Sequence, residues 1–188
     1  MEWNVPGTVL QIDRSEADGL EEKFRSMFLA GGMVLSQVSN LTGLEPYTIQ
    51  NWVKRGFLPP PEHKRYTITQ LCRILNINML RASLPLESIC SLLSFVNGRL
   101  DDTSDDLIDD AKLYFLFLRL AARAKELDEP SLWAQAMDDA LADYQEPVAG
   151  ARDRVEKVLQ VMMTAWIAAK MRHKAEEMLR QMNEDLMK

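Results

Sequence analysis

The sequence has few of the residues that break helices or cross-link small folds. Its 188 residues include only eight glycines, eight prolines and two cysteines. Two cysteines cannot provide the disulfide framework of a small secreted domain, and a chain of this length buries enough surface to fold without one. This low cysteine usage is typical of a reducing compartment, so we expect a cytoplasmic protein. β-Branched residues are also sparse beside Leu, Ala, Met, Glu, Lys and Arg, which predicts an all-α fold.

Long apolar runs and motifs of catalysis are also missing. The first twenty residues carry acids and have no apolar stretch of the kind found in secretory signals. The most apolar segment, 158–171, is too short to span a bilayer, so we expect no membrane partner. The sequence contains no nucleophile elbow, phosphate-binding loop or cluster of His and Cys, and it therefore predicts neither an enzyme nor a metal or cofactor site.

Acidic residues outnumber basic ones, but the two are unevenly distributed. The net charge is −6, which by itself argues against nucleic acid as a partner. Residues 101–146 contain mostly acids, whereas residues 45–81 contain two acids, Glu45 and Glu62, against a larger set of cations: Lys54, Arg55, Lys64, Arg65, Arg73 and Arg81. Salt confines the field of a charge to about 8–10 Å. A local basic surface can therefore attract phosphates on an acidic protein.

Two short helical patterns lie on either side of Thr42-Gly43-Leu44, after a first helix predicted over 15–29 with Ser15 as its cap. The second pattern opens with Pro46, which suits a first helical position, and its spacing directs Ile49, Trp52 and Val53 inward. Gly56 is expected to end it in a left-handed conformation. Two such helices joined by a tight turn predict a helix-turn-helix.

The segment 57–67 predicts a β-hairpin wing. Pro59-Pro60-Pro61 cannot continue a helix. We expect short strands at 57–58 and 65–67 to pair, with 62–64 at the tip of the hairpin.

Helical patterns occupy most of the remaining chain. Thr67 and Gln70 have the spacing of a capping box at the start of a helix to about residue 82, and Pro85 starts a helix that ends before Gly98. An acidic connector, 99–106, precedes three further helices at about 107–127, 131–144 and 151–187. This organisation predicts three regions: an N-terminal helical extension, 1–33; a winged helix-turn-helix, 34–98; and a C-terminal helical region, 99–188.

The segments 35–49 and 48–58 resemble the opening and the recognition helix of MerR-family DNA-binding domains. Arg65-Tyr66 resembles the end of that family's wing, and 84–89 resembles the start of its next helix. The resemblance implies a MerR-like winged helix-turn-helix that binds double-stranded DNA as a homodimer. One difference is that MerR relatives usually carry an arginine and an aromatic residue where this chain has Gln50 and Asn51.

Residues 20–118 resemble more closely the uncharacterised bacterial domain-of-unknown-function family 1836. The phrase Asn51-Trp52-Val53-Lys54 carries this resemblance, together with Asp106-Leu107-Ile108 and Leu113-Tyr114 downstream.

The site residues follow from the helical spacing and from the wing. If Ile49 and Trp52 face the core, the polar residues between them face outward. Gln and Asn can bind adenine through two hydrogen bonds, and cations suit phosphates. The predicted DNA-binding residues of a transcriptional regulator are Tyr47, Thr48, Gln50, Asn51, Lys54, Arg55, His63, Lys64 and Arg65.

Two alternatives remain open. The net negative charge, and the departure from MerR relatives at Gln50 and Asn51, are also compatible with another function. On this interpretation the protein is a helical protein-interaction module that keeps the winged-helix shape without binding DNA. The C-terminal helix carries two apolar stripes, and we expect one to pack on its own domain and the other to form a dimer seam. One stripe consists of Val155, Leu159, Met162, Trp166 and Ala169, and the other of Ile167, Met171, Ala175, Met178 and Met182. A pocket for a small-molecule effector, lined by Trp133, Trp166 and methionines, is the alternative use of the second stripe.

Overall fold

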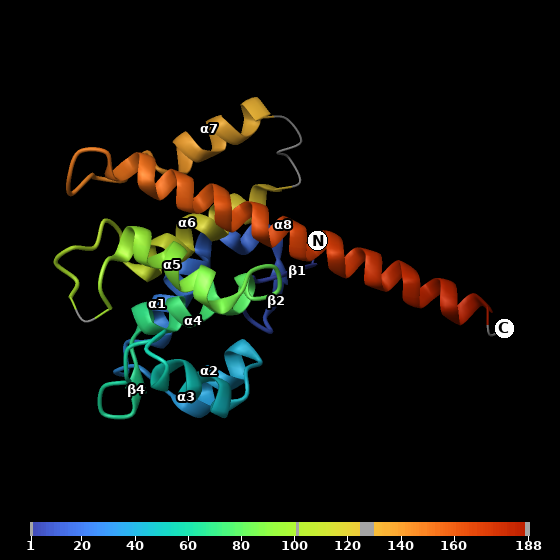
Figure 1. Ribbon diagram of the computed structural model, residues 1–188, viewed down its shortest axis with the longest axis horizontal. Coiled ribbons are helices and arrows are strands. Elements are labelled where there is room, and N and C mark those ends of the chain that lie inside the picture. The colour runs from blue at the N-terminus through green and yellow to red at the C-terminus, as the bar shows by residue number, and fades with distance from the viewer. Residues whose placement is uncertain (1, 101, 125–129, 187–188) are drawn as a thin grey trace.

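Eight α-helices, one 3-10 helix and two small antiparallel sheets make up the described part of the computed structural model (Figure 1). The structure describes residues 2–100, 102–124 and 130–186, without the side chains of 130–132, 185 and 186. The prediction of a mostly helical protein with small hairpins and a long C-terminal helix is confirmed.

The N-terminus forms a hairpin that the sequence pattern did not reveal. Strands β1 (Glu2–Asn4) and β2 (Gln11–Asp13) pair antiparallel around a turn at Pro6-Gly7, whose glycine has φ +77°. The helix expected over 15–29 is instead a 3-10 helix, Arg14–Gly19, followed by α1 (Leu20–Met27). Asp13 rather than Ser15 caps it, because the Asp13 carboxylate accepts a hydrogen bond of 2.9 Å from the Ser15 amide. The Pro-Gly dipeptide between two short apolar-polar alternations was the available signal.

The strand pairing predicted within 57–67 is wrong. Strand β4 (Arg65–Tyr66) pairs with β3 (Met33–Val34), which immediately precedes α2 (Leu35–Thr42). Leu58 turns into the core, and Gln70 Nε2 donates a hydrogen bond of 2.9 Å to the Pro60 carbonyl. The proline-containing stretch is therefore held by side chains instead of a strand ladder, since proline has no amide hydrogen to donate.

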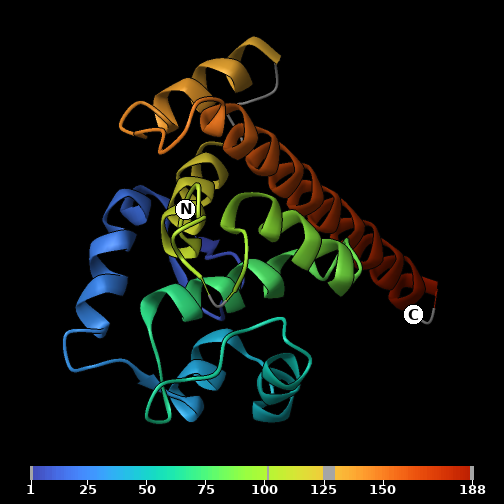
Figure 2. The ribbon, with the colours of Figure 1, turned by 60° about the vertical axis from the view of Figure 1, so that its left-hand side comes forward.

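Helix α4 (Ile68–Leu80) is the central element. The predicted capping box is present: the Thr67 hydroxyl accepts from the Gln70 amide, and the Gln70 side chain accepts from the Thr67 amide. In Figure 2, α2 and α3 (Pro46–Lys54) lie on one side of α4. The helices on the other side are α5 (Leu86–Asn97), α6 (Asp110–Arg123) and α8 (Ala151–Leu186). The buried core continues from residues before Gly98 to residues after it. The proposed regions 34–98 and 99–188 thus share one core, and the limits between them stay a prediction.

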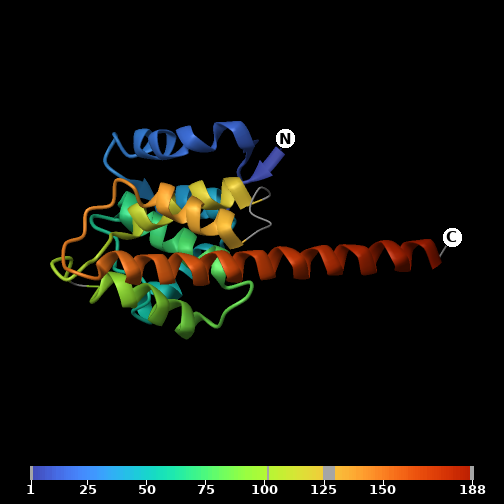
Figure 3. The same ribbon diagram turned by 90° about the horizontal axis from the view of Figure 1, so that it is seen from above.

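The last two helices are α7 (Pro130–Ala140) and α8 (Ala151–Leu186), close to the predicted 131–144 and 151–187. Residues 125–127 of the helix expected over 107–127 lie outside the described residues. The first half of α8 packs on α4, α5 and α6 through buried residues such as Val155, Leu159 and Met162. Its second half projects beyond every other described element (Figure 3). Helix α8 therefore buries one of its two predicted stripes and leaves the other in solvent.

Candidate nucleic-acid interface

Helices α2 and α3 form a tight pair because the chain turns sharply between them. Gly43 adopts φ +69° and its amide donates to the Ser39 carbonyl, which ends α2 as the sequence predicts. A Cβ at this position would lie 2.8 Å from the Val9 side chain, so glycine suits both the backbone conformation and the space. Ile49 and Trp52 are buried beneath α3, which fixes the opposite side of that helix toward solvent.

The outward side of α3 is polar. Tyr47, Gln50 and Lys54 are exposed, and the exposed fraction of Tyr47 is 73%. Thr48 and Asn51 are half-buried. Tyr47, Gln50 and Lys54 lie three and four residues apart and therefore form one stripe along the helix. The inward and outward faces predicted from the spacing are confirmed, although Asn51 is less accessible than Gln50.

A strained turn carries the cations at the tip of the segment 57–67. The Arg65 amide donates to the Glu62 carbonyl at 2.8 Å, and the two intervening residues, His63 and Lys64, have φ values of 48° and 64°. Left-handed backbone costs a residue with a Cβ roughly 1–2 kcal/mol, and glycine or asparagine is usual in such turns. Both side chains are exposed. The location predicted for the tip is thus confirmed, although the strands flanking it are not those expected.

Two of the predicted phosphate-binding arginines already have partners. Arg55 Nη2 lies 2.7 Å from Glu87 Oε1, and the guanidinium lies 4.5 Å from the centre of the Phe57 ring. Arg65 Nη1 donates a hydrogen bond of 2.9 Å to the Gly32 carbonyl. An exposed ion pair such as Arg55–Glu87 is worth at most about 1 kcal/mol, so a phosphate could replace the carboxylate.

The other predicted phosphate-binding residues differ from these arginines in their contacts. Within the described ranges, Lys54, His63 and Lys64 make no ion pair or hydrogen bond. These three side chains are the cationic groups that a phosphate backbone could approach without displacing an acid.

Arg73 belongs to the core and not to the basic surface on which its sequence position placed it. Its side chain is 2% exposed, and Nη1 lies 3.0 Å from Oδ2 of Asp110, which is itself 7% exposed. Arg73 Nε also donates a hydrogen bond of 2.9 Å to the carbonyl of Phe57. Burial raises the pKa of Asp110, an effect that the Arg73 guanidinium opposes. Arg73 thereby joins the start of the segment 57–67 to α6.

Sequence reasoning missed this pair because its members are 37 residues apart. The only available signal was a lone arginine among the apolar residues of α4. A charge in such a position requires a buried partner, although the sequence does not say which one.

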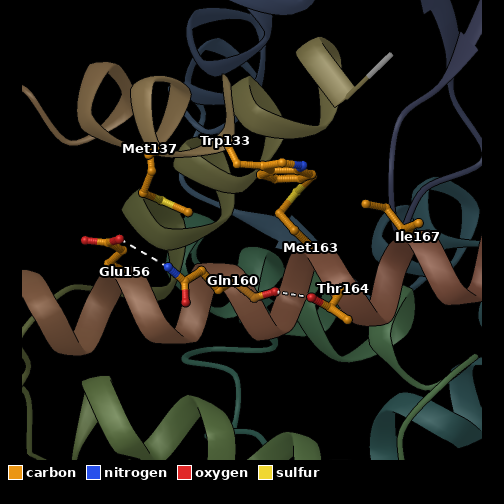
Figure 4. A pocket seen from close by; sticks show the side chains of 8 residues that line it. Trp133, Met137, Glu156, Gln160, Met163, Thr164 and Ile167 are labelled. Atoms are coloured by element: carbon orange, nitrogen blue, oxygen red, sulfur yellow. Dashed lines mark hydrogen bonds between the residues drawn. The ribbon is translucent and has the colours of Figure 1, made fainter. Parts of the chain in front are cut away.

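The expected effector pocket divides into two separate cavities. Trp133 and Met137 of α7 face Gln160, Met163 and other residues of α8 across a groove of about 430 Å³ (Figure 4). Trp166 lies outside this groove and lines a second cavity, near the N-terminal hairpin. The two tryptophans predicted to share a ligand therefore do not meet.

No helix in the described ranges has the length and hydropathy required to cross a membrane. Nor does that part of the chain bring three His, Cys, Asp or Glu side chains into an arrangement that could hold a metal ion. Cys72 is buried and Cys90 half-buried, and both are free thiols whose pKa is raised by burial.

Comparison with known proteins finds a sequence family that is similar to the part of the chain containing the interface. Residues 29–117 match the model of the family described as "Domain of unknown function (DUF1836)". The Bacillus subtilis (strain 168) protein described as "Uncharacterized protein YkrK" is 29% identical over 102 residues, which span 52% of this chain and 44% of that protein. No solved structure matches the chain. The matched range includes α2, α3, the segment 57–67 and both partners of the Arg73–Asp110 pair, so the candidate interface lies within the part of the chain that is similar to this family.

Proposed function

We propose that the protein is a DNA-binding transcriptional regulator that inserts α3 into the major groove and places the segment 57–67 against the adjoining backbone. The observations that carry the proposal are the exposed polar stripe of α3 and, ten residues further along the chain, a strained turn with two exposed polar side chains, His63 and Lys64. Gln50 on α3 is placed to meet base edges, whereas Lys54 and Lys64 meet phosphates. In this arrangement α2, α3 and the segment 57–67 act as a MerR-like winged helix-turn-helix.

The strained turn supports the proposal independently. Residues with a Cβ are held in left-handed backbone where glycine would be less costly, and such strain is concentrated at functional sites. Here it holds His63 and Lys64, both exposed, at the tip of the segment. Glu62 is the neighbouring acid, so the tip remains cationic overall when Arg65 is included.

Fluorescence anisotropy with duplexes from the protein's own promoter region, measured across a salt series, tests this function. Affinity should fall as salt rises, because each phosphate contact releases counterions. Lys54→Gln and Lys64→Gln should each weaken all duplexes similarly and reduce the slope of log affinity against log salt by about 0.9. Lys157 is an exposed lysine on α8, and Lys157→Gln is the control, which should change neither the affinity nor the slope.

Base reading is tested separately. Gln50→Ala should cost about 1–3 kcal/mol on the preferred duplex and much less on random DNA. Asn51→Ala should have a smaller effect on this preference, because Asn51 is half-buried. Absence of binding at low salt, or affinity that does not depend on salt, would overturn the proposal.

A second candidate function is a protein-interaction module, favoured by the exposed aromatic ring of Tyr47 and the net charge of −6. Tyrosine is enriched at the centres of protein interfaces. On this alternative, a purified partner protein binds the wild type and not Tyr47→Ala, whereas DNA fails to bind at any salt concentration.

The exposed side of α8, from Val161 onward, supplies the surface for a homodimer. Val161, Thr164, Ala168, Met171, Ala175, Met178 and Met182 recur at alternating spacings of three and four residues, which is the heptad pattern of a coiled coil. We call these residues the α8 seam. Its three central methionines, Met171, Met178 and Met182, are 55–62% exposed. The seam extends for about 32 Å at 1.5 Å per residue.

The charges along the seam favour an antiparallel partner. Cations precede Ala175 at Lys170, Arg172 and Lys174, whereas acids follow it: Glu176, Glu177 and Glu184. Arg180 interrupts the acidic half but pairs within its own helix, with Glu177 and Glu184. An antiparallel second copy puts the basic half opposite the acidic half, whereas a parallel copy would oppose like charges.

Sedimentation velocity tests this dimer. Met178→Glu should weaken dimerisation by tenfold or more, roughly the effect of a charge inserted into a small apolar seam. Asn183→Glu adds the same charge beside the seam on the outer side of α8 and should leave the dimer intact. A wild-type protein that is monomeric at micromolar concentration would exclude the seam as the dimer contact, irrespective of the DNA-binding result.

A further inference from the structure

A groove runs between the N-terminal hairpin and the point at which α8 leaves the helical body. Trp3 and Arg14 line one wall, the end of α4 forms the floor at Met79, and α8 from Trp166 to Glu176 forms the other wall. Its volume is about 690 Å³, within the range of small-molecule sites, which is about 300–1,000 Å³.

Each wall of the groove presents an indole ring with a cation against it. The Arg14 guanidinium lies 5.8 Å from the centre of the Trp3 ring. On α8, Lys170 Nζ lies 4.3 Å from the centre of the Trp166 ring, which is held in turn by an edge contact of 5.8 Å with Phe117. Trp3 and Trp166 are only 4% and 7% exposed, so each contributes a small part of its ring to the groove, with a cation beside it.

Cations exceed acids among the lining residues. Arg14, Lys170 and Arg172 are joined by His173, whereas the acids are Glu2 and Glu176. Arg172 Nε lies 3.4 Å from Glu176 Oε1, but both side chains are about 60% exposed, so this pair is weak. Arg14 makes no ion pair with any residue in the described part of the chain.

Two buried donors on the hairpin side have no acceptor. Neither the indole N–H of Trp3 nor the Nε–H of Arg14 finds a hydrogen-bond partner among the described residues, although Trp3 is only 4% exposed. A buried donor without an acceptor costs roughly 1–3 kcal/mol. An oxygen atom brought by a ligand would remove part of that cost.

The groove between α7 and α8 in Figure 4 lacks these properties. Its polar side chains are satisfied within α8: Gln160 donates to Glu156, and the Thr164 hydroxyl donates to the Gln160 carbonyl. Its one charged lining residue, Glu156, would repel an anion.

We propose that the groove between the N-terminal hairpin and α8 binds an aromatic anion. The ring of the ligand lies against Trp3 and Trp166, and its carboxylate, sulfonate or phosphate group is bound by Arg14 with Lys170 and Arg172 nearby. This site uses no residue of α3, so its test is separate from that of DNA binding. Lys170, Arg172 and Glu176 line the groove and also belong to the charge pattern that we assign to the α8 dimer.

Isothermal titration of the full chain with 1-naphthalenesulfonate and with uncharged 1-naphthalenemethanol tests the site. The sulfonate should bind at least about tenfold more tightly than the alcohol, since hydrogen bonds to charged groups are worth about 1.5–3 kcal/mol. The sulfonate should also quench tryptophan emission, and this quenching should decrease in Trp166→Phe.

Variants separate the groove from other surfaces. Arg14→Gln and Lys170→Gln should each weaken sulfonate binding about tenfold, equivalent to about 1.4 kcal/mol. Lys170 lies on exposed helix, so its substitution does not threaten folding. Lys157→Gln and Met178→Glu should leave the affinity unchanged, because neither residue lines the groove. No binding at about 1 mM, equal affinity for the alcohol, or unchanged affinity in both groove variants would overturn the proposal.

Discussion

Replacing Arg73 with methionine removes the cation that pairs with the buried carboxylate of Asp110. The wild-type pair is 3.0 Å apart, with side chains 2% and 7% exposed, so water cannot take over the lost interaction. The carbonyl of Phe57 loses its donor as well. Breaking one side of a buried pair typically costs 3–5 kcal/mol, and we expect Arg73→Met to lower the free energy of unfolding by about that amount.

The loss should depend on pH. Burial already raises the pKa of Asp110, and removal of the guanidinium raises it further. A folded-state pKa above the unfolded value means that stability is lost as pH rises through the folded pKa. The free energy of unfolding of Arg73→Met should therefore be closer to that of the wild type at pH 5 than at pH 8.

Urea unfolding followed by circular dichroism measures both effects. Arg81→Met is the matched control, because Arg81 is exposed at the end of α4, and it should change stability by no more than about 0.5 kcal/mol. The double variant Arg73→Met/Asp110→Leu should recover most of the loss, since no unpaired charge remains. A single-variant loss below about 1 kcal/mol, or a double variant less stable than the single, would refute this account of the pair.

Three further measurements address local features of the fold. Burial and neighbouring acids raise the pKa of Asp106 to about 6, so the free energy of unfolding should fall as pH rises through 6. Asp106→Asn should flatten this pH dependence, and an unchanged pH profile in the variant would contradict the prediction. Tyr114→Phe removes a buried hydrogen bond of 2.7 Å to the Pro6 carbonyl and should cost about 1–3 kcal/mol in urea unfolding; a neutral effect would mean that the N-terminal hairpin contributes no stability through this bond. Gly43→Ala should lower the thermal midpoint by the equivalent of about 1–2 kcal/mol, because φ is +69° and the added methyl group meets Val9; a stabilised variant would exclude a left-handed Gly43 between α2 and α3.

Local chemistry allowed much of the candidate interface to be predicted. The helical spacing of Ile49 and Trp52 determines which side of α3 is buried, because a side chain's direction follows from its position along the helix. The Thr67–Gln70 capping box and the left-handed Gly56 depend on neighbours within a few residues. Such features need no tertiary information, and the structure confirms them.

Tertiary structure alone decided which distant segments meet. Strand β4 pairs with β3 and not with residues 57–58, since a two-residue strand has too little pattern to specify its partner. The sequence alone predicted Arg73 to lie on a basic surface, because the sequence does not show whether a charged residue is buried. The structure shows that Arg73 belongs to the core, where it pairs with Asp110 of α6.

The two halves of α8 illustrate the same distinction. The sequence itself determined a long helix with two apolar stripes, because periodicity is a local property of the chain. Which stripe is buried depends on where α4, α5 and α6 end, and that is set by the packing of the whole core. The projecting α8 seam, and the groove beside it that brings Trp3 and Trp166 together from opposite ends of the chain, are consequences of that packing alone.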